Sequence, residues 1–382
     1  MQKQTELDSI PALINKTFPI PGRFRSALPS DIAELSRLLT NNRGERSLSY
    51  LSRPNYLSAY LHYFLPWNLY RLCILLPLLN INLSSDNVIA DFGCGPLTFT
   101  TALWISRPDL RSLPLEFNCI DRSFPVLEAG KKIFTALSGE TPWKINLIKK
   151  DVNIQKGGGD RRGKAALVCT INMFNEIYEH LSHNNTEGLR KTAVNAALFM
   201  HNEAAEDASI LTVEPGVPQS GKFISLLRKA FFELGRYPLS PCTHNMPCPF
   251  NIPQTKKWCH FAFEAANAPK ELKRLSAAAR LPKERLVFSF LLTGAASQKK
   301  QPVFAAKTDD YSQPEQPVRV ISDAFPLYNN QYGRYGCSAR GLVLLAGEKS
   351  RVDKIASGSL FTSVFTAKEQ RDSKSGALIM EV

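Results

Sequence analysis

The sequence predicts an α/β protein in which a parallel sheet follows a helical N-terminal region. In the first 85 residues, apolar side chains recur at spacings of three and four, as in D-I-A-E-L-S-R-L-L-T, which indicates amphipathic helices. From Asn87 the segment N-V-I-A-D-F-G-C-G-P reads as a buried strand and a glycine turn. Strand candidates then alternate with helical segments, a pattern typical of a parallel α/β sheet.

Composition limits the class of protein. The 382 residues are 44% hydrophobic, enough for a full core, and the formal net charge of +13 favours a polyanionic partner such as nucleic acid. A basic surface without a specific partner is the alternative. The longest apolar run, residues 72–83, is shorter than the roughly 20 residues of a membrane helix, so we expect no membrane association. The first residues carry neither a secretion nor a transit signal, so we expect a cytoplasmic protein whose eight cysteines stay reduced.

We expect three regions along the chain. Residues 1–85 form an N-terminal helical subdomain, residues 86–365 form the α/β domain with its C-terminal strands, and residues 366–382 form a disordered tail. Residues 295–317 are predicted to be loop, and the glycine-rich turn at 157–164 is read as a flexible connection because it lacks the phosphate-loop pattern. Residues 270–285 form a basic helical stretch, either a solvated face or a phosphate contact.

The strand ends carry the candidate ligand-binding residues. Asp91 ends the first strand, and Gly93 and Gly95 allow the backbone to approach a ligand before a helix whose first N–H groups are free. The second strand, L-E-F-N-C-I-D, ends in Asp121, where a carboxylate can accept both hydroxyls of a ribose. A third strand candidate leads to Asp151. The arrangement predicts a nucleoside cofactor.

Two cofactors fit this pattern, NAD and S-adenosylmethionine. The dinucleotide fingerprint requires a third glycine where this chain has Thr98. Asp91, directly before the turn, instead favours S-adenosylmethionine. An α/β core that has lost its ligand is the structural alternative.

A second candidate site lies at residues 241–261, P-C-T-H-N-M-P-C-P-F-N-I-P-Q-T-K-K-W-C-H-F. The segment has neither helical nor strand periodicity, so a metal or iron-sulfur cluster bound by Cys242, Cys248 and Cys259 is the natural way to order it. Structural zinc sites favour short C-x2-4-C pairs, which this spacing lacks. A zinc site of the three cysteines with His244 or His260 remains open.

These motifs together resemble a known family. D-F-G-C-G-P resembles motif I of class I S-adenosylmethionine-dependent methyltransferases. V-E-P-G, P-C-T-H-x-x-x-C-P and W-C-H-F resemble the methyltransferase-like family of mitochondrial small-ribosomal-subunit assembly factors and their bacterial relatives. The resemblance runs from about Tyr50 to Gly347, and the cysteine motifs are far more specific than motif I.

The resemblance implies a class I methyltransferase-like (Rossmann-like) sheet with an iron-sulfur insertion. It implies contacts with S-adenosylmethionine at Asp91, Gly93, Gly95, Asp121 and Asp151. It also implies a 4Fe-4S cluster, with zinc as the alternative, bound by Cys242, Cys248, Cys259 and Cys337. One departure is that Leu97 stands where motif I often has a third glycine.

The resemblance also implies a function. We expect a factor for assembly or maturation of the small ribosomal subunit that binds rRNA, is a monomer away from the ribosome, and resides in the cytoplasm of a bacterium or the mitochondrial matrix of a eukaryote. The alternative is an active rRNA methyltransferase of the same subunit. The catalytic residues are unknown, and N-M-F-N-E-I, with Asn172, Asn175 and Glu176, lacks the prolines of amino-methylating enzymes, so we expect weak or absent methyl transfer. A redox enzyme is disfavoured because no second redox cofactor site is visible.

Overall fold

The computed structural model describes residues 2–40, 50–155, 163–178, 180–182, 185–251, 257–295, 315–364 and 370–382. The chain forms two compact units, each described by itself. The first comprises Met1–Asn153, Lys164–Ser182 and Glu264–Glu284, and the second comprises Ile154–Gly163, His183–Phe263 and Arg285–Val382.

Helices form the N-terminal part of the first unit, as the sequence predicts. They are α1 (Gln2–Thr17), α2 (Gly22–Arg25), α3 (Leu28–Thr40), η2 (Tyr50–Ser52), α4 (Pro54–Ala59), the π-helical η3 (Tyr60–Phe64), α5 (Leu65–Leu75) and η4 (Leu76–Leu78). In α3 the buried residues Leu28, Ile32 and Leu35 recur at helical spacing and form one apolar face. The division of the chain into subdomains stays a prediction.

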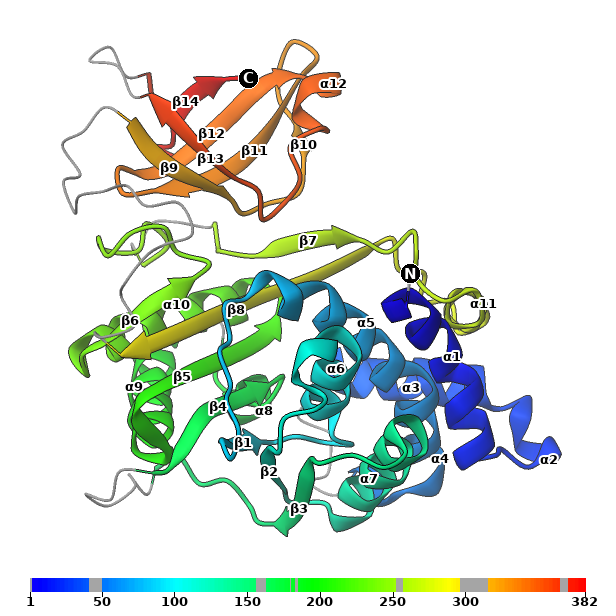
Figure 1. Ribbon diagram of the computed structural model, residues 1–382. Helices are drawn as coiled ribbons and strands as arrows, with labels where there is room; N and C mark the ends of the chain where they lie inside the picture. The colour runs from blue at the N-terminus through cyan, green and yellow to red at the C-terminus, as the bar shows by residue number, and fades with distance from the viewer. Residues whose placement is uncertain are drawn as a thin grey trace. The chain divides into compact units, whose positions relative to one another are not determined.

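The sheet of the first unit is parallel, and its strand order places the candidate site. Its strands are β1 (Val88–Phe92), β2 (Glu116–Asp121), β3 (Lys144–Lys149) and β4 (Ala165–Ile171), in the order β3-β2-β1-β4. The helices along this part are α6 (Thr98–Ser106), η5 (Pro108–Leu110), α7 (Phe124–Ser138), α8 (Phe174–Ile177) and α11 (Lys270–Ala278) (Figure 1). The chain leaves β1 toward β2 on one side and returns to β4 on the other, so the strand order reverses between β1 and β4. In open α/β sheets, ligands bind at the carboxyl ends of the strands at such a point.

The second unit contains an antiparallel sheet in which β8 is central. Its elements are α9 (Thr186–Glu203), β5 (Ala204–Pro215), α10 (Pro218–Glu233), β6 (Arg236–Ser240), β7 (Phe261–Glu264) and β8 (Arg285–Ala295). Strand β8 pairs with β5 and β6 in antiparallel register and also pairs with β7. The segment between β6 and β7 is the cysteine-rich segment 241–260.

The C-terminal strands of the second unit form a separate small sheet, drawn in orange and red in Figure 1. Its elements are β9 (Glu315–Val320), β10 (Phe325–Pro326), β11 (Gln331–Ser338), β12 (Gly341–Glu348), α12 (Lys349–Val352), β13 (Leu360–Val364) and β14 (Leu378–Glu381). Val318, Val343, Leu345 and Leu378 are among the residues of its buried core. Strand β14 lies within the stretch 366–382, where the sequence predicts disorder; the buried Ala377 and Leu378 supply the apolar contacts that order it.

Parts of the sequence expectations lie outside the described residues. Residues 156–162 of the glycine-rich turn and residues 296–314 of the predicted loop are among these. Strand β8 extends to Ala295 and β9 begins at Glu315, so the described ends of that predicted loop are strand. Among the described helices, none is both long and apolar enough to cross a membrane.

Candidate functional site: a switch-point pocket and a cysteine-rich segment

The turn after β1 has the conformation that its glycines allow. Gly93 has a φ of 64° and Gly95 a φ of 55°, values at which a side chain is strained. A Cβ on Gly93 would lie 2.6 Å from Cγ of Met173, which follows β4. The turn therefore packs closely against the segment after β4.

Leu97 stands where motif I often has a third glycine, and its backbone is left-handed. Its φ and ψ are 54° and 41°, in the left-handed region, and it is the N-cap residue of α6. Its side chain is fully buried and contributes no surface to the pocket described below. The Leu97 side chain thus packs into the core beneath the turn, and its backbone has a conformation that glycine adopts readily.

Two carboxyl groups end the strands β1 and β2. Asp91 is fully buried, and apart from the nearby thiol of Cys169 no hydrogen-bond partner of its carboxyl oxygens is found among the described residues. Burial, followed by the neighbouring charge of Asp121, raises the pKa of Asp91 to about 8, so Asp91 is mostly protonated at neutral pH. Asp121 accepts hydrogen bonds from the backbone N–H groups of Gly95 (3.0 Å to Oδ2) and Ser123 (2.9 Å to Oδ1). Burial raises its pKa, and these hydrogen bonds oppose the rise.

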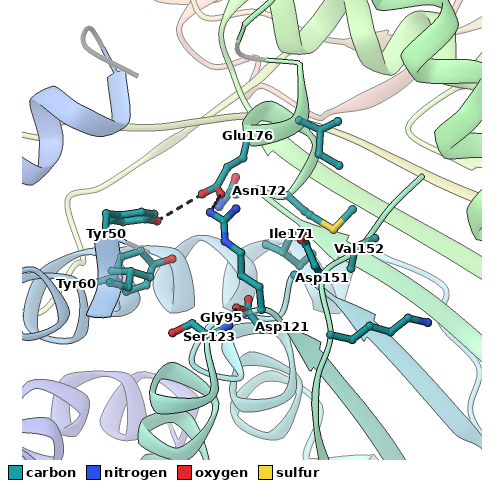
Figure 2. Close-up of a pocket in the computed structure, with 16 residues that line it drawn as sticks. Tyr50, Tyr60, Gly95, Asp121, Ser123, Asp151, Val152, Ile171, Asn172 and Glu176 are labelled. Carbon is teal, nitrogen blue, oxygen red and sulfur yellow. Dashed lines mark hydrogen bonds and ion pairs between the residues drawn. The ribbon is translucent and has the colours of Figure 1, made fainter. Parts of the chain in front are cut away.

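A pocket opens at the carboxyl ends of these strands (Figure 2). Its lining comes from the ends of β1, β2 and β4, from the segment after β3 and from the N-terminal helices. The lining residues are Tyr50, Leu51, Tyr60, Gly93, Gly95, Asp121, Arg122, Ser123, Lys150, Asp151, Val152, Ile171, Asn172, Met173, Glu176 and Ile177. Four of the five predicted cofactor residues line this one pocket, and Asp91 is buried without contributing to its surface.

A set of polar groups at the pocket was not predicted as a site from the sequence. The hydroxyl of Tyr50 lies 3.4 Å from Oε1 of Glu176, and Arg122 forms an ion pair with Oε2 of the same side chain at 3.0 Å. Figure 2 shows Glu176 pointing toward Tyr50. Burial and the charges of Glu176 and Asp121 raise the pKa of Tyr60, which begins the π-helix η3. Arg122 was detectable as the residue after Asp121, whereas no sequence signal marks Tyr50.

The cysteines of the second predicted site come from distant parts of the second unit. Cys242, Cys248 and Cys259 lie between β6 and β7, and Cys337 lies on β11; all four are free and partly buried. Burial, followed by the charges of the other cysteines, raises the pKa values of Cys259 and Cys337. Cys242 and Cys248 thus contribute to the raised pKa of both thiols.

Hydrogen bonds fix the cysteine-rich segment against β9. Nε of Arg319 donates to the carbonyl oxygen of Pro241 at 3.1 Å, and the Thr243 hydroxyl donates to that of Pro317 at 3.4 Å. His244 lies with Nε2 3.4 Å from the sulfur of Cys337. Burial, followed by the charge of Arg228, lowers the pKa of His244 to about 4.

The two histidines differ in their surroundings. The ring of His260 stacks on Trp258 at 4.9 Å, and its Nδ1 lies 3.1 Å from the carbonyl oxygen of Trp258, a packing role. Within the described part of the chain, no group of three or more His, Cys, Asp or Glu side chains is arranged to hold a metal ion. The remaining cysteines, Cys73, Cys94, Cys119 and Cys169, are buried as expected.

The parallel sheet with its helices, and the pocket where its strand order reverses, define the first unit as an open α/β fold. The chain belongs to the Rsm22 family, described as mitochondrial small ribosomal subunit Rsm22, whose model matches residues 88–324. That match includes the glycine turn, Asp121, Asp151 and the cysteine-rich segment, but not Cys337. No protein with a curated function matches the chain.

Several solved structures are similar to the chain at low sequence identity. A possible exported protein from Bordetella parapertussis is 13% identical, with 77% of this chain and 95% of that chain covered and a TM-score of 0.34. A putative class I S-adenosylmethionine-dependent methyltransferase from Listeria monocytogenes is 10% identical, with 80% and 90% covered and a TM-score of 0.35. A geranyl diphosphate methyltransferase in complex with SAM is 11% identical, with 66% and 92% covered and a TM-score of 0.33.

Proposed function

We propose that the protein is an assembly or maturation factor of the small ribosomal subunit that binds rRNA, S-adenosylmethionine and a 4Fe-4S cluster. The observation that carries the proposal is the family match over residues 88–324, which includes both the switch-point turn and the cysteine-rich segment. The factor resides in the mitochondrial matrix in a eukaryote and in the cytoplasm in a bacterium. Away from the ribosome it is a monomer.

The pocket residues support S-adenosylmethionine as its ligand. A carboxylate has about four lone-pair sites, and backbone donors use one on each oxygen of Asp121, which leaves two for the hydroxyls of a ribose. The turn of Gly93 and Gly95 lets the ligand approach the backbone, and Asp91, mostly neutral, adds little negative charge beneath it. When bound, S-adenosylmethionine supplies an electrophilic methyl group.

The assignment of this pocket can be tested by calorimetry. Asp121→Asn, which keeps the size of the side chain, is expected to weaken S-adenosylmethionine binding by about tenfold or more because a neutral amide replaces a charged acceptor. Asp109→Asn, on an exposed carboxylate of the first unit paired with Arg107, is the matched control and should bind like the unaltered protein. Equal affinity of the two variants would contradict the proposed ribose contact.

We assign the four cysteines to a cluster in preference to a single zinc ion, because their spacing lacks the short C-x2-4-C pairs that structural zinc sites favour. The positive charges of Arg228 and Arg319 lower the pKa of Cys259 against the effect of burial. These cations suit a centre that carries the negative charge of several thiolates. We assign Cys242, Cys248, Cys259 and Cys337 as its ligands.

Iron analysis and absorbance spectroscopy test this assignment. Protein purified without oxygen is expected to be brown and to contain about four iron atoms per chain, as a 4Fe-4S cluster requires. A colourless protein that contains zinc would contradict the cluster.

An exposed basic helix supports binding to rRNA. Lys270, Lys273 and Arg274 are exposed on α11, and Arg280 is exposed directly after it. If all four contact phosphates, the logarithm of the affinity falls with the logarithm of the salt concentration with a contribution of about −3 to the slope. If a variant with alanine at all four positions shows the same salt dependence of RNA affinity as the unaltered protein, these side chains do not contact the RNA phosphates.

The second candidate function is active methylation of small-subunit rRNA. The observation that favours it is the carboxylate of Glu176 beside Asn172 in the pocket lining. Glu176 is engaged by Tyr50 and Arg122, and the segment lacks the prolines of amino-methylating enzymes, so we propose weak or absent transfer. Multiple-turnover incorporation of radioactive methyl groups into small-subunit rRNA would establish the second function instead.

A further inference from the structure

The C-terminal strands of the second unit have the topology of an oligonucleotide-binding fold. Their order is β13-β9-β11-β12-β14. Strands β9, β11 and β12 form an antiparallel meander, β13 pairs antiparallel with β9, and β14 pairs parallel with β12. The helix α12 lies between β12 and β13 (Figure 1). Numbered along the chain, β9, β11, β12, β13 and β14 correspond to strands 1 to 5 of that fold. Their order across the sheet is therefore 4-1-2-3-5, and the parallel pair joins strands 3 and 5.

The ends of this sheet come together. The hydroxyl of Ser363 on β13 lies 3.3 Å from the sulfur of Met380 on β14, so the first and last strands of the sheet are neighbours. Five strands therefore enclose the buried core of Val318, Val343 and Leu345. In this fold, ligands bind on the outer face of the second and third strands, between the loop that joins strands 1 and 2 and the loop that joins strands 4 and 5.

The register identifies the outer face of β11 and β12. Val343 and Leu345 point into the barrel core, so Leu344 and its cross-strand partner Tyr335 point outward. Tyr335 and Leu342 are partly buried and pack with Leu344 in a second apolar cluster. Nζ of Lys257 lies 5.0 Å from the centre of the Tyr335 ring. Leu344 is only 4% exposed and the Phe325 ring centre lies 4.8 Å from that of Tyr335, so this face offers the partly exposed Tyr335 ring beside a cation.

The two loops that flank this face are joined by a second tyrosine and lysine. Tyr328, in the loop before β11, is 75% exposed. Its hydroxyl accepts a hydrogen bond of 2.8 Å from Nζ of Lys374, in the connection between β13 and β14, and this nitrogen lies 4.7 Å from the ring centre. A large aromatic side chain is thus held in solvent by a cation on the opposite loop.

We propose that the outer face of β11 and β12, between Tyr328 and Tyr335, binds single-stranded RNA. Bases stack on the two tyrosine rings, and Lys374 and Lys257 lie where the phosphates pass. Alternating aromatic rings and cations suit a single strand, because its unpaired bases expose their faces whereas those of a duplex are stacked on each other. The chain's net charge of +13 matches a polyanion better than a neutral oligosaccharide. That this RNA is rRNA rests on the proposed function, whereas the binding face itself does not.

Fluorescence anisotropy of the full chain with a labelled 12-nucleotide single-stranded RNA tests the proposal. Tyr328→Ala should weaken binding about tenfold, since a stacked base contributes roughly 1–3 kcal/mol, whereas Tyr328→Phe should keep most of the affinity. Lys374→Ala should reduce the salt slope by about 0.7. Tyr332→Ala is the matched control. Nζ of Lys349 lies 5.5 Å from the centre of the Tyr332 ring, so this tyrosine also has a lysine partner. Tyr332 is three positions from Tyr335 and therefore lies on the other side of the strand. It should bind like the unaltered protein.

The same titrations with duplex RNA and with maltoheptaose, together with cosedimentation of the chain with small ribosomal subunits, separate the possible outcomes. The proposal is overturned if Tyr328→Ala binds the single strand as tightly as Tyr332→Ala does, or if duplex or oligosaccharide binds more tightly than the single strand. If the chain does not cosediment with small ribosomal subunits but Tyr328→Ala still weakens binding of the single strand, the ribosomal function is refuted and this face remains an RNA-binding site. Thermal melting of the Tyr328 variants should match the unaltered protein, because Tyr328 is exposed. Melting of Tyr332→Ala shows whether that control is folded.

Discussion

Replacement of Leu97 distinguishes a glycine-like backbone from an ordinary helix start. Leu97 is fully buried and left-handed. Its truncation to alanine should cost about 3 kcal/mol of unfolding free energy, the typical loss for a buried leucine. Glycine loses the same contacts but relieves the strain of about 1 kcal/mol that a side chain imposes in this conformation. Leu97→Gly should therefore be more stable than Leu97→Ala by about 1 kcal/mol.

Urea unfolding of both variants measures this difference, and Leu103 provides the matched control. Leu103 is equally buried but lies inside the same helix, α6, where glycine is less favourable than alanine by about 1 kcal/mol. The order of the two variants should thus reverse between the positions. If Leu97→Ala is at least as stable as Leu97→Gly, Leu97 does not have a left-handed backbone conformation. Affinity for S-adenosylmethionine should change little in stable variants, because the side chain does not line the pocket.

Three other predictions concern stability. Gly93→Ala should cost more than Gly139→Ala, because both glycines have a positive φ but only at Gly93 would the new Cβ meet another side chain, at 2.6 Å; thermal melts that rank them in the opposite order would contradict the close packing. Burial lowers the pKa of Lys283 from 10.5 to about 7. Between these values the unfolded chain binds more protons, so stability rises with pH, and relative to Lys283→Met the unaltered protein should gain about 2 kcal/mol from pH 7 to pH 9. A difference in urea unfolding that stays constant with pH would exclude the shift. Cys337→Ser and Cys242→Ser should lower the melting temperature of the iron-loaded protein by similar amounts, and an unchanged melt for Cys337→Ser alone would assign the fourth ligand to another residue.

The parts of the candidate site that were predictable from the sequence are those set by local pattern. The turn of Gly93 and Gly95 follows a short apolar strand, and Asp121 ends the next one, so strand order alone places them together. Glu176 and Tyr50 meet only through tertiary packing, and their separation along the chain gave no signal. Cys337 was expected through the family resemblance, since no spacing rule links it to Cys259.

Two features of the C-terminal region show why the rest was not predictable. Strand β14 has four residues, too few for a period to be recognised, and it is ordered by pairing with β12. The outer face of β11 becomes a candidate surface only when the register separates Tyr335 from Tyr332. Both depend on long-range strand pairing, which a single sequence does not specify.

Density-gradient sedimentation of ribosomes from cells that lack this protein tests the proposed role in small-subunit assembly. We expect fewer mature small subunits, accumulated small-subunit precursors with unprocessed or incompletely folded rRNA, and normal large subunits. Re-expressed tagged protein should sediment with those precursors. An unchanged small-subunit profile, with the tagged protein only at the top of the gradient, would contradict a role in small-subunit assembly.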